Sequence, residues 1–183
     1  MKTALMVVDM QNGFLNSSTE HIVEHVKTLL REAEKRGVPT LFTRFVNHPD
    51  SSWVKWIRWS RFMQSPEIDL IPALAGKTIN VFDKSTYTAF IPAVSDFVRT
   101  NAIERLTICG IATDGCVLKT AVDAFERGIQ PIIVSDACAS HAGAEVHAAG
   151  LMLAARFIGK RQIISLKDLT AFGFEAPSFT ESH

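Results

Sequence analysis

The sequence lacks an excess of charge of either sign, because 19 basic side chains are balanced by 19 acidic ones. Proteins that wrap nucleic acid or dock on an anionic membrane usually present a basic surface, so this balance indicates neither partner. We therefore expect the partner to be a small molecule, with no nucleic acid and no membrane involved.

Long hydrophobic runs are also lacking. Asp9 ends the apolar start "MKTALMVV" short of a signal-peptide core of roughly 7–15 residues. The stretch 148–159 is interrupted by Arg156 and is shorter than the roughly 20 apolar residues that span a bilayer. Cysteine is scarce, and an odd count of three argues against a disulfide framework. These absences predict a soluble, cytoplasmic protein with free thiols.

The sequence does contain short apolar, β-branched runs that alternate with longer amphipathic segments, a pattern typical of a parallel sheet with crossover helices. The predicted strands are 4–10, 39–45, 78–84, 105–110, 130–137 and 161–166, and the predicted helices are 22–33, 92–98, 117–127 and 144–157. We predict one domain over residues 1–183, a three-layer α/β/α sandwich with a six-stranded, mainly parallel, doubly wound sheet. An irregular insertion near 47–74 would cap the substrate site.

Three residues of types suited to catalysis stand at or just after predicted strand ends, namely Asp9, Lys84 and Cys116. In a doubly wound sheet, ligands bind beyond the carboxyl ends of the strands, so these side chains should meet at one rim. Taken singly, such an aspartate is commonly a turn cap and such a lysine is commonly solvated. Their joint placement indicates a site.

The three cysteines differ in setting. Cys109 lies inside the apolar strand "LTICG", and Cys138 lies in "SDACAS", so both are expected to be packed residues. Cys116 would stand in the first turn of the next helix, where the helix dipole should lower its pKa from about 8.5 toward neutrality. The free N–H groups of that turn could also stabilise an oxyanion.

Three segments carry a family resemblance: "DMQNGF" at 9–14, "DKSTYTAF" at 83–90 and "GIATDGCV" at 110–117. In this order and spacing they resemble the signature segments of the isochorismatase-like cysteine hydrolases, which include nicotinamidases and N-carbamoylsarcosine amidohydrolases. The resemblance extends from about residue 4 to residue 172. It implies that Cys116 is the nucleophile, Asp9 the general base and acid, and Lys84 the cation beside them.

The resemblance further implies a cis peptide bond between Ile111 and Ala112. The backbone N–H groups of Ala112 and Cys116 would then form an oxyanion hole. The expected reaction is cleavage of a C–N bond in a small amide or ureido compound through a thioester. Two alternatives stay open, a thiol redox protein that uses Cys116 and a catalytically silent binding module on the same fold. The redox alternative lacks a resolving cysteine at a motif spacing.

The resemblance also bears on metal and cofactor. Metal-bearing nicotinamidases have an Asp-x-His group and a further histidine after the second strand, where this sequence has "TRFVNHPD" at 43–50. Arg44, Phe45 and Val46 cannot bind a metal, which leaves only His48 and Asp50. We therefore expect no metal and no cofactor. Isochorismate hydrolases of the family lack the nucleophilic cysteine, so Cys116 argues against that activity.

Aromatic side chains are the candidates for substrate binding. Phe14 follows the segment of Asp9, Tyr87 belongs to the second signature segment, and Trp53 lies in the tryptophan-rich stretch 51–62. Trp53, Trp56 and Ile57 have helical spacing, so they form either a packed stripe or an aromatic lid over a small planar or apolar substrate.

Other residues of the chain are given structural interpretations. Trp59, with Arg58 and Arg61, could belong to a subunit interface, and we expect a homo-oligomer, a dimer or larger. His147, in the helix 144–157, is interpreted as a core or interface residue. His141 is interpreted as a loop residue without a chemical role.

Overall fold

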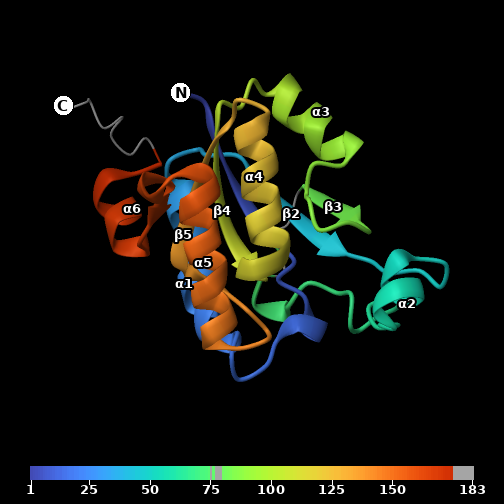
Figure 1. The fold of residues 1–183 in the computed structure, drawn as a ribbon. Coiled ribbons are helices and arrows are strands. Elements are labelled where there is room, and N and C mark those ends of the chain that lie inside the picture. Colours follow the sequence, from blue (N-terminus) through green and yellow to red (C-terminus); the bar gives the residue numbers. More distant parts are fainter. Residues whose placement is uncertain (75, 77–79, 175–183) are drawn as a thin grey trace.

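The sheet has six strands, all parallel, in the order β3-β2-β1-β4-β5-β6. The computed structural model describes residues 1–74, 76 and 80–174 (Figure 1). The strands are β1 (Thr3–Val8), β2 (Thr40–Phe45), β3 (Val81–Lys84), β4 (Arg105–Ile111), β5 (Gln130–Ala139) and β6 (Ile163–Ile164). The predicted doubly wound α/β fold is confirmed. Residues 78 and 79 of the third predicted strand, and residues 175–183 of the predicted domain, lie outside the described residues.

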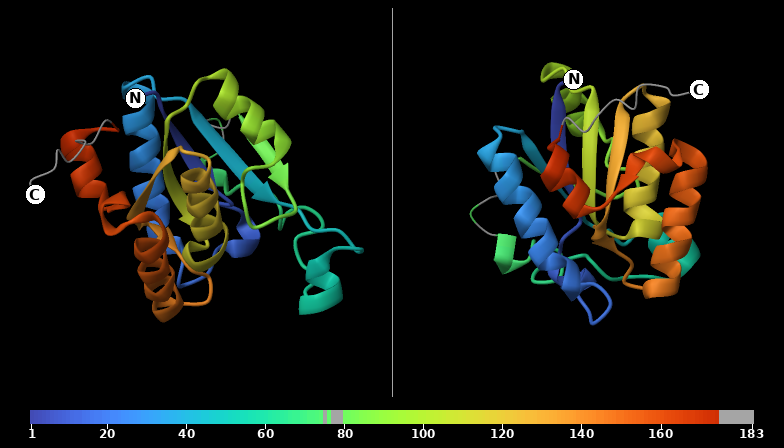
Figure 2. Two further views of the ribbon diagram at one scale, coloured as in Figure 1. Left: turned by 45° about the horizontal axis from the view of Figure 1, so that its top comes forward. Right: turned by 90° about the vertical axis from the view of Figure 1, so that its left-hand side faces the viewer.

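Helices cover both faces of the sheet. Those longer than five residues are α1 (Val23–Lys35), α2 (Ser52–Ile57), α3 (Pro92–Thr100), α4 (Leu118–Glu126), α5 (Ala144–Ile158) and α6 (Leu166–Phe172). Helices α1 and α6 lie on one face, and α4 and α5 on the other (Figure 2). Every residue of β1 and β4 is buried, which is why these strands read as continuous apolar runs rather than alternating ones. None of the helices in the described part of the chain is long and apolar enough to cross a membrane.

The strand order reverses between β1 and β4. The chain runs from β1 outward to β2 and β3, then returns across the sheet to β4 on the other side of β1. Gly110 allows this contact, because a Cβ built on it would lie 2.1 Å from the carbonyl oxygen of Val8 and its φ is +118°. Such a reversal opens a crevice at the carboxyl ends of the two strands, where ligands bind.

The segment between β2 and β3 contains α2 and a 3-10 turn at Pro72–Leu74, and α2 projects away from the sheet (Figure 1). The buried Gln11 ties this segment to the rim. Its side-chain amide donates to the carbonyl oxygens of Phe45, at 2.9 Å, and Ile68, at 2.8 Å, and it accepts from the Phe45 N–H at 2.7 Å. A single antiparallel bridge joins Gln11 and Leu70. The segment is therefore anchored beside the ends of β1 and β2.

Candidate active site

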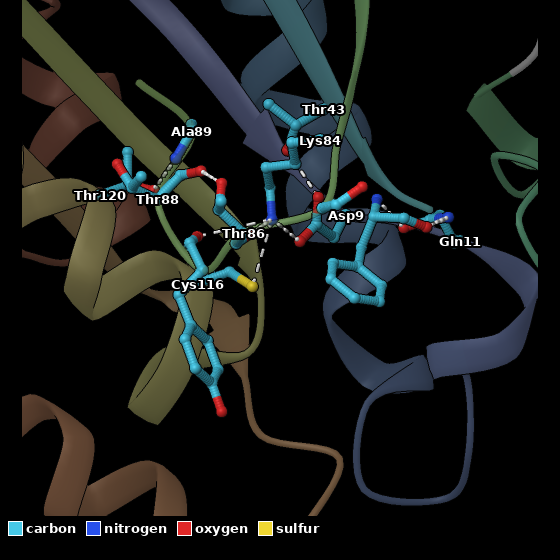
Figure 3. Close-up of polar contacts among 12 residues, drawn as sticks. Asp9, Gln11, Thr43, Lys84, Thr86, Thr88, Ala89, Cys116 and Thr120 are labelled. Carbon is cyan, nitrogen blue, oxygen red and sulfur yellow. Dashed lines mark hydrogen bonds and ion pairs between the residues drawn. The ribbon is translucent and has the colours of Figure 1, made fainter. Parts of the chain in front are cut away.

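Asp9, Lys84 and Cys116 meet at the carboxyl rim of the sheet (Figure 3). Asp9 directly follows β1, Lys84 is the last residue of β3, and Cys116 follows β4. The Nζ atom of Lys84 lies 2.7 Å from Oδ2 of Asp9 and 3.3 Å from Sγ of Cys116. The side chains of Asp9 and Lys84 are fully buried, and Cys116 is 8% exposed. The structure thus brings together the three residues that the strand pattern placed at one rim.

Hydrogen bonds fix the positions of the two charged groups. Thr43 Oγ1 donates to Oδ1 of Asp9 at 2.6 Å, and the Asp9 N–H donates to the Thr43 carbonyl oxygen at 3.1 Å. The Lys84 ammonium also donates to the carbonyl oxygen of Thr86 at 2.9 Å (Figure 3). With the carbonyl oxygen of Tyr87 at 3.4 Å, the ammonium therefore has four partners: a carboxylate, a sulfur and two carbonyl oxygens. These contacts hold the charged groups of the cluster in place.

The charges of this cluster are set by opposing influences. Burial alone would lower the pKa of Lys84, but the neighbouring Asp9 and Cys116 outweigh it, so the pKa is raised and the ammonium is positive. Burial, and then the negative charge of Asp9, raise the pKa of Cys116 to about 12 against the opposing influence of Lys84. The predicted lowering of the Cys116 pKa is therefore wrong. The thiol is protonated at neutral pH and must lose its proton before it can attack.

Cys116 lies in a π-helical turn, Thr113–Val117, that precedes α4. The predicted position in the first turn of an ordinary helix is thus wrong in detail. The carbonyl oxygen of Ala112 accepts the N–H groups of Gly115 and Val117, each at 3.0 Å, which closes a wide turn around the thiol. The peptide bond between Ile111 and Ala112, immediately before this turn, is cis.

Helix α5 supports the π-helical turn from its outer side. His147 Nδ1 and Thr113 Oγ1 are hydrogen-bonded at 2.7 Å. A Cβ built on Gly150 would lie 2.8 Å from the backbone nitrogen of Asp114, so only glycine allows α5 to pack this closely. His147 is thus a contact of the turn. No spacing in the sequence indicates this contact, because α5 is remote in the chain from residue 113.

The thiol opens onto a cavity of about 260 Å³. Phe14, Trp53 and Tyr87, the three aromatic residues predicted to bind substrate, all line it. The ring centroids of Trp53 and Tyr87 are 4.4 Å apart, and those of Trp53 and Phe45 are 4.9 Å apart. The aromatic walls are therefore in mutual contact.

Sequence reasoning missed several lining residues. Beyond Ala112 and Cys116, these are Phe45, Asp114, Gly115 and His141. Ile57, which the lid interpretation named, and Trp59, which was interpreted as an interface residue, also line the cavity. They come from segments far apart in the chain, and no common spacing links them. Only their positions beside strand ends or within the insertion could have indicated them.

The tryptophan-rich stretch does not form a packed stripe. Trp56 is 72% exposed and Ile57 is also exposed, whereas Trp53 turns toward the cavity. Trp59 packs with its ring centroid 5.6 Å from that of Phe45, and the Arg61 guanidinium pairs with Glu67 at 2.6 Å. The stripe interpretation is therefore wrong, and the homo-oligomer stays a prediction.

The other two thiols are distant from this chemistry. Cys109 and Cys138 are free and buried, and neither lines the cavity. Burial raises the pKa of Cys138 to about 12 and that of Cys109 well above its usual range. Their interpretation as packed residues is confirmed.

The end of β2 does not fit the metal site of the metal-bearing nicotinamidases. Arg44 donates two hydrogen bonds to the carboxylate of Asp83, at 2.7 and 2.8 Å. The side-chain amide of Asn47 donates to the carbonyl oxygens of Trp59 and Arg61. Within residues 1–74, 76 and 80–174, no three histidine, cysteine, aspartate or glutamate side chains are grouped to hold a metal ion.

A doubly wound sheet with a thiol, a carboxylate and an ammonium group at its switch point defines an α/β enzyme with a cysteine at its site. Residues 3–161 match the family model described as "Isochorismatase domain", and the chain belongs to the isochorismatase family. It is a hydrolase of that family, whose members include amidohydrolases.

Named relatives show the range of this family. The chain is 25% identical over 142 residues to isochorismatase family protein 2A of Dictyostelium discoideum, across 75% of this chain and 66% of the relative. It is 27% identical to ureidoacrylate amidohydrolase RutB of Acinetobacter baylyi, across 86% of this chain and 79% of the relative. Nicotinamidase PncA of Bacillus subtilis superimposes with a TM-score of 0.79 at 26% identity, across 90% of this chain and 100% of that chain. The chain thus spans about two thirds of the first relative's length.

Proposed function

We propose that this hydrolase cleaves the C–N bond of a small amide or ureido compound through a thioester on Cys116. The observation that carries the proposal is the buried contact of one ammonium group with both Asp9 and Cys116, at 2.7 and 3.3 Å, beside an aromatic cavity. A thiol with a base next to it, opening onto a cavity, is the arrangement that nucleophilic catalysis requires.

The first half of the reaction forms the thioester. Asp9 accepts the thiol proton as Sγ of Cys116 bonds to the substrate's carbonyl carbon, and the carbonyl electron pair moves to oxygen. Ala112 and Cys116 both line the cavity, and their backbone N–H groups are the proposed donors to this oxyanion. Asp9 then returns the proton to the leaving nitrogen, the C–N bond breaks, and ammonia or an amine departs.

The second half releases the acid. Asp9 takes a proton from a water molecule as the water oxygen bonds to the thioester carbon. The S–C bond then breaks, the sulfur regains a proton from Asp9, and the carboxylic or carbamic acid leaves. Lys84 stabilises the negative charge on Asp9 and on the sulfur as each appears, since its ammonium already contacts both groups.

The geometry argues against the redox alternative. A thiol redox cycle on Cys116 needs a second thiol that can reach it. Cys109 and Cys138 are buried, and neither is among the residues that line the cavity. A silent binding module would not need a buried lysine and aspartate, whose transfer out of water is costly. Both observations support hydrolysis.

The test is a panel of small amides and ureido compounds, with release of ammonia as the measurement. At least one compound should release ammonia at a rate proportional to the amount of enzyme. A denaturing quench during turnover should show an added acyl mass on the peptide that contains Cys116. If turnover proceeds with slow deacylation and that peptide never carries the added mass, water attacks directly and the thioester is excluded.

Hydrolysis should also survive exhaustive chelation. Cys116 supplies the attacking group, so no metal-bound hydroxide is required, and the end of β2 offers Arg44 paired with Asp83 in place of metal ligands. The rate should stay within about twofold of the untreated enzyme, and elemental analysis should find well under one metal ion per chain. Loss of activity that added zinc, iron or manganese restores would contradict this prediction.

A further inference from the structure

The cavity lining carries a single carboxylate and no fully charged cation. Among the described residues that line it, Asp114 is the only aspartate, glutamate, lysine or arginine. Asp114 is exposed, and its carboxylate makes no hydrogen bond or ion pair with any described residue. Burial raises the pKa of Tyr87, and the electrostatic influence of Cys116 and then of Asp114 raises it further.

Three basic side chains near the cavity are paired with carboxylates of the protein itself. Lys84 is fully buried against Asp9, and Arg61 pairs with Glu67. Arg44 is held by two hydrogen bonds to Asp83. Among the described residues that line the cavity, His141 is the only histidine, and its ring lies 5.2 Å from that of Phe14. No lysine or arginine is thus among the described residues that line the cavity and could receive a substrate carboxylate.

Most of the other large side chains that line the cavity are aromatic. Phe45, Trp53 and Trp59 line the cavity, and the face of an aromatic ring carries negative quadrupole charge, which attracts cations and disfavours anions. The cavity of about 260 Å³ is slightly smaller than the range of about 300–1,000 Å³ that is typical of small-molecule sites. It therefore suits one compact, planar group beside the thiol.

We propose that the cavity selects amides of uncharged or cationic planar groups and rejects amides that also carry a carboxylate, and that Asp114 is the residue that sets this preference. The proposal deepens the proposed function and rests on it for the position of the amide beside Cys116. Two like charges a few ångströms apart, partly shielded from water, repel by enough to change an affinity about tenfold or more.

The test uses three benzamides of nearly equal shape that differ in the para group: 4-carbamoylbenzoate is anionic, terephthalamide is neutral, and 4-carbamoylbenzamidine is cationic. Binding is measured on the Cys116→Ala protein by tryptophan fluorescence and calorimetry, so that hydrolysis plays no part. The anion should bind at least about tenfold more weakly than the neutral amide, and the cation at least as tightly as the neutral amide.

Adding Asp114→Asn to the Cys116→Ala protein should reduce the ratio of the dissociation constants of the anion and the cation by about tenfold. The affinity for the neutral amide should stay almost unchanged. The matched control is Glu145→Gln, which removes one exposed negative charge from the first turn of α5, outside the lining, and should keep the ranking. The proposal is overturned if the anion binds as tightly as the neutral amide, if Asp114→Asn weakens all three equally, or if none of them binds.

Ammonia release by the unmodified enzyme is measured in parallel with the same compounds. Hydrolysis with the same charge ranking supports both proposals. The expected binding ranking without ammonia release from these or any other amides would contradict the proposed function, while the charge selectivity of the cavity would stand.

Discussion

Replacing Cys116 with alanine should abolish hydrolysis, with a loss in kcat of at least about 10³-fold, because no covalent route remains. Alanine fills the same space apart from the sulfur, so the π-helical turn Thr113–Val117 and the ion pair of Lys84 with Asp9 should persist. The measurement is ammonia release at saturating substrate, with circular dichroism and thermal unfolding as checks that the protein is folded.

Cys109→Ala is the matched control. Cys109 is fully buried in β4, so its replacement leaves a small cavity and should lower the free energy of unfolding by about 1 kcal/mol. Hydrolysis by the folded protein should stay close to that of the unmodified enzyme. Equal losses in the two variants, at temperatures where both are folded, would remove Cys116 from its proposed role.

The fold was predictable because the chain repeats one simple pattern. The central strands β1 and β4 are short, mainly apolar runs buried on both faces, and glycine follows the last turn of several helices, as at Gly37, Gly128 and Gly159. The strand ends then placed Asp9, Lys84 and Cys116 at one rim, since all strands of a parallel sheet point the same way. Local sequence patterns are sufficient for conclusions of this kind.

The details of the site were less predictable, because they depend on contacts between distant segments. A helix start alone would lower the pKa of Cys116, yet burial and Asp9 together raise it to about 12. The supporting contact of Gly150 with the turn, and the place of Asp114 in the cavity, depend on how α5 and α4 pack. The sequence indicates which groups are present at a site, while their protonation depends on tertiary packing.

Asp9→Asn should lower kcat/KM by about 10²–10⁴-fold, the usual contribution of a general acid or base. Asparagine has nearly the same shape as aspartate and can keep the hydrogen bond from Thr43 Oγ1, which is 2.6 Å long. A neutral amide, however, can neither take the proton of Cys116 nor balance the Lys84 ammonium. The loss should therefore be chemical, and thermal unfolding should show that the variant is folded.

The same variant should make the thiol easier to ionise while turnover falls. The negative charge of Asp9 raises the pKa of Cys116 and Lys84 lowers it, so removing that charge leaves the ammonium unopposed and shifts the pKa of the thiol downward. Alkylation of Cys116 by iodoacetamide should accordingly begin at lower pH in Asp9→Asn than in the unmodified enzyme. Asp83→Asn is the control. It removes a carboxylate that is adjacent to Lys84 in the sequence but pairs with Arg44 at the surface. Neither turnover nor the pH profile of alkylation should change in this variant. A loss of turnover without the shift in the pH of alkylation would mean that Asp9 acts by positioning alone. Unaltered turnover would exclude Asp9 from the proton transfers, because the charged carboxylate is the group proposed to accept the proton of the thiol.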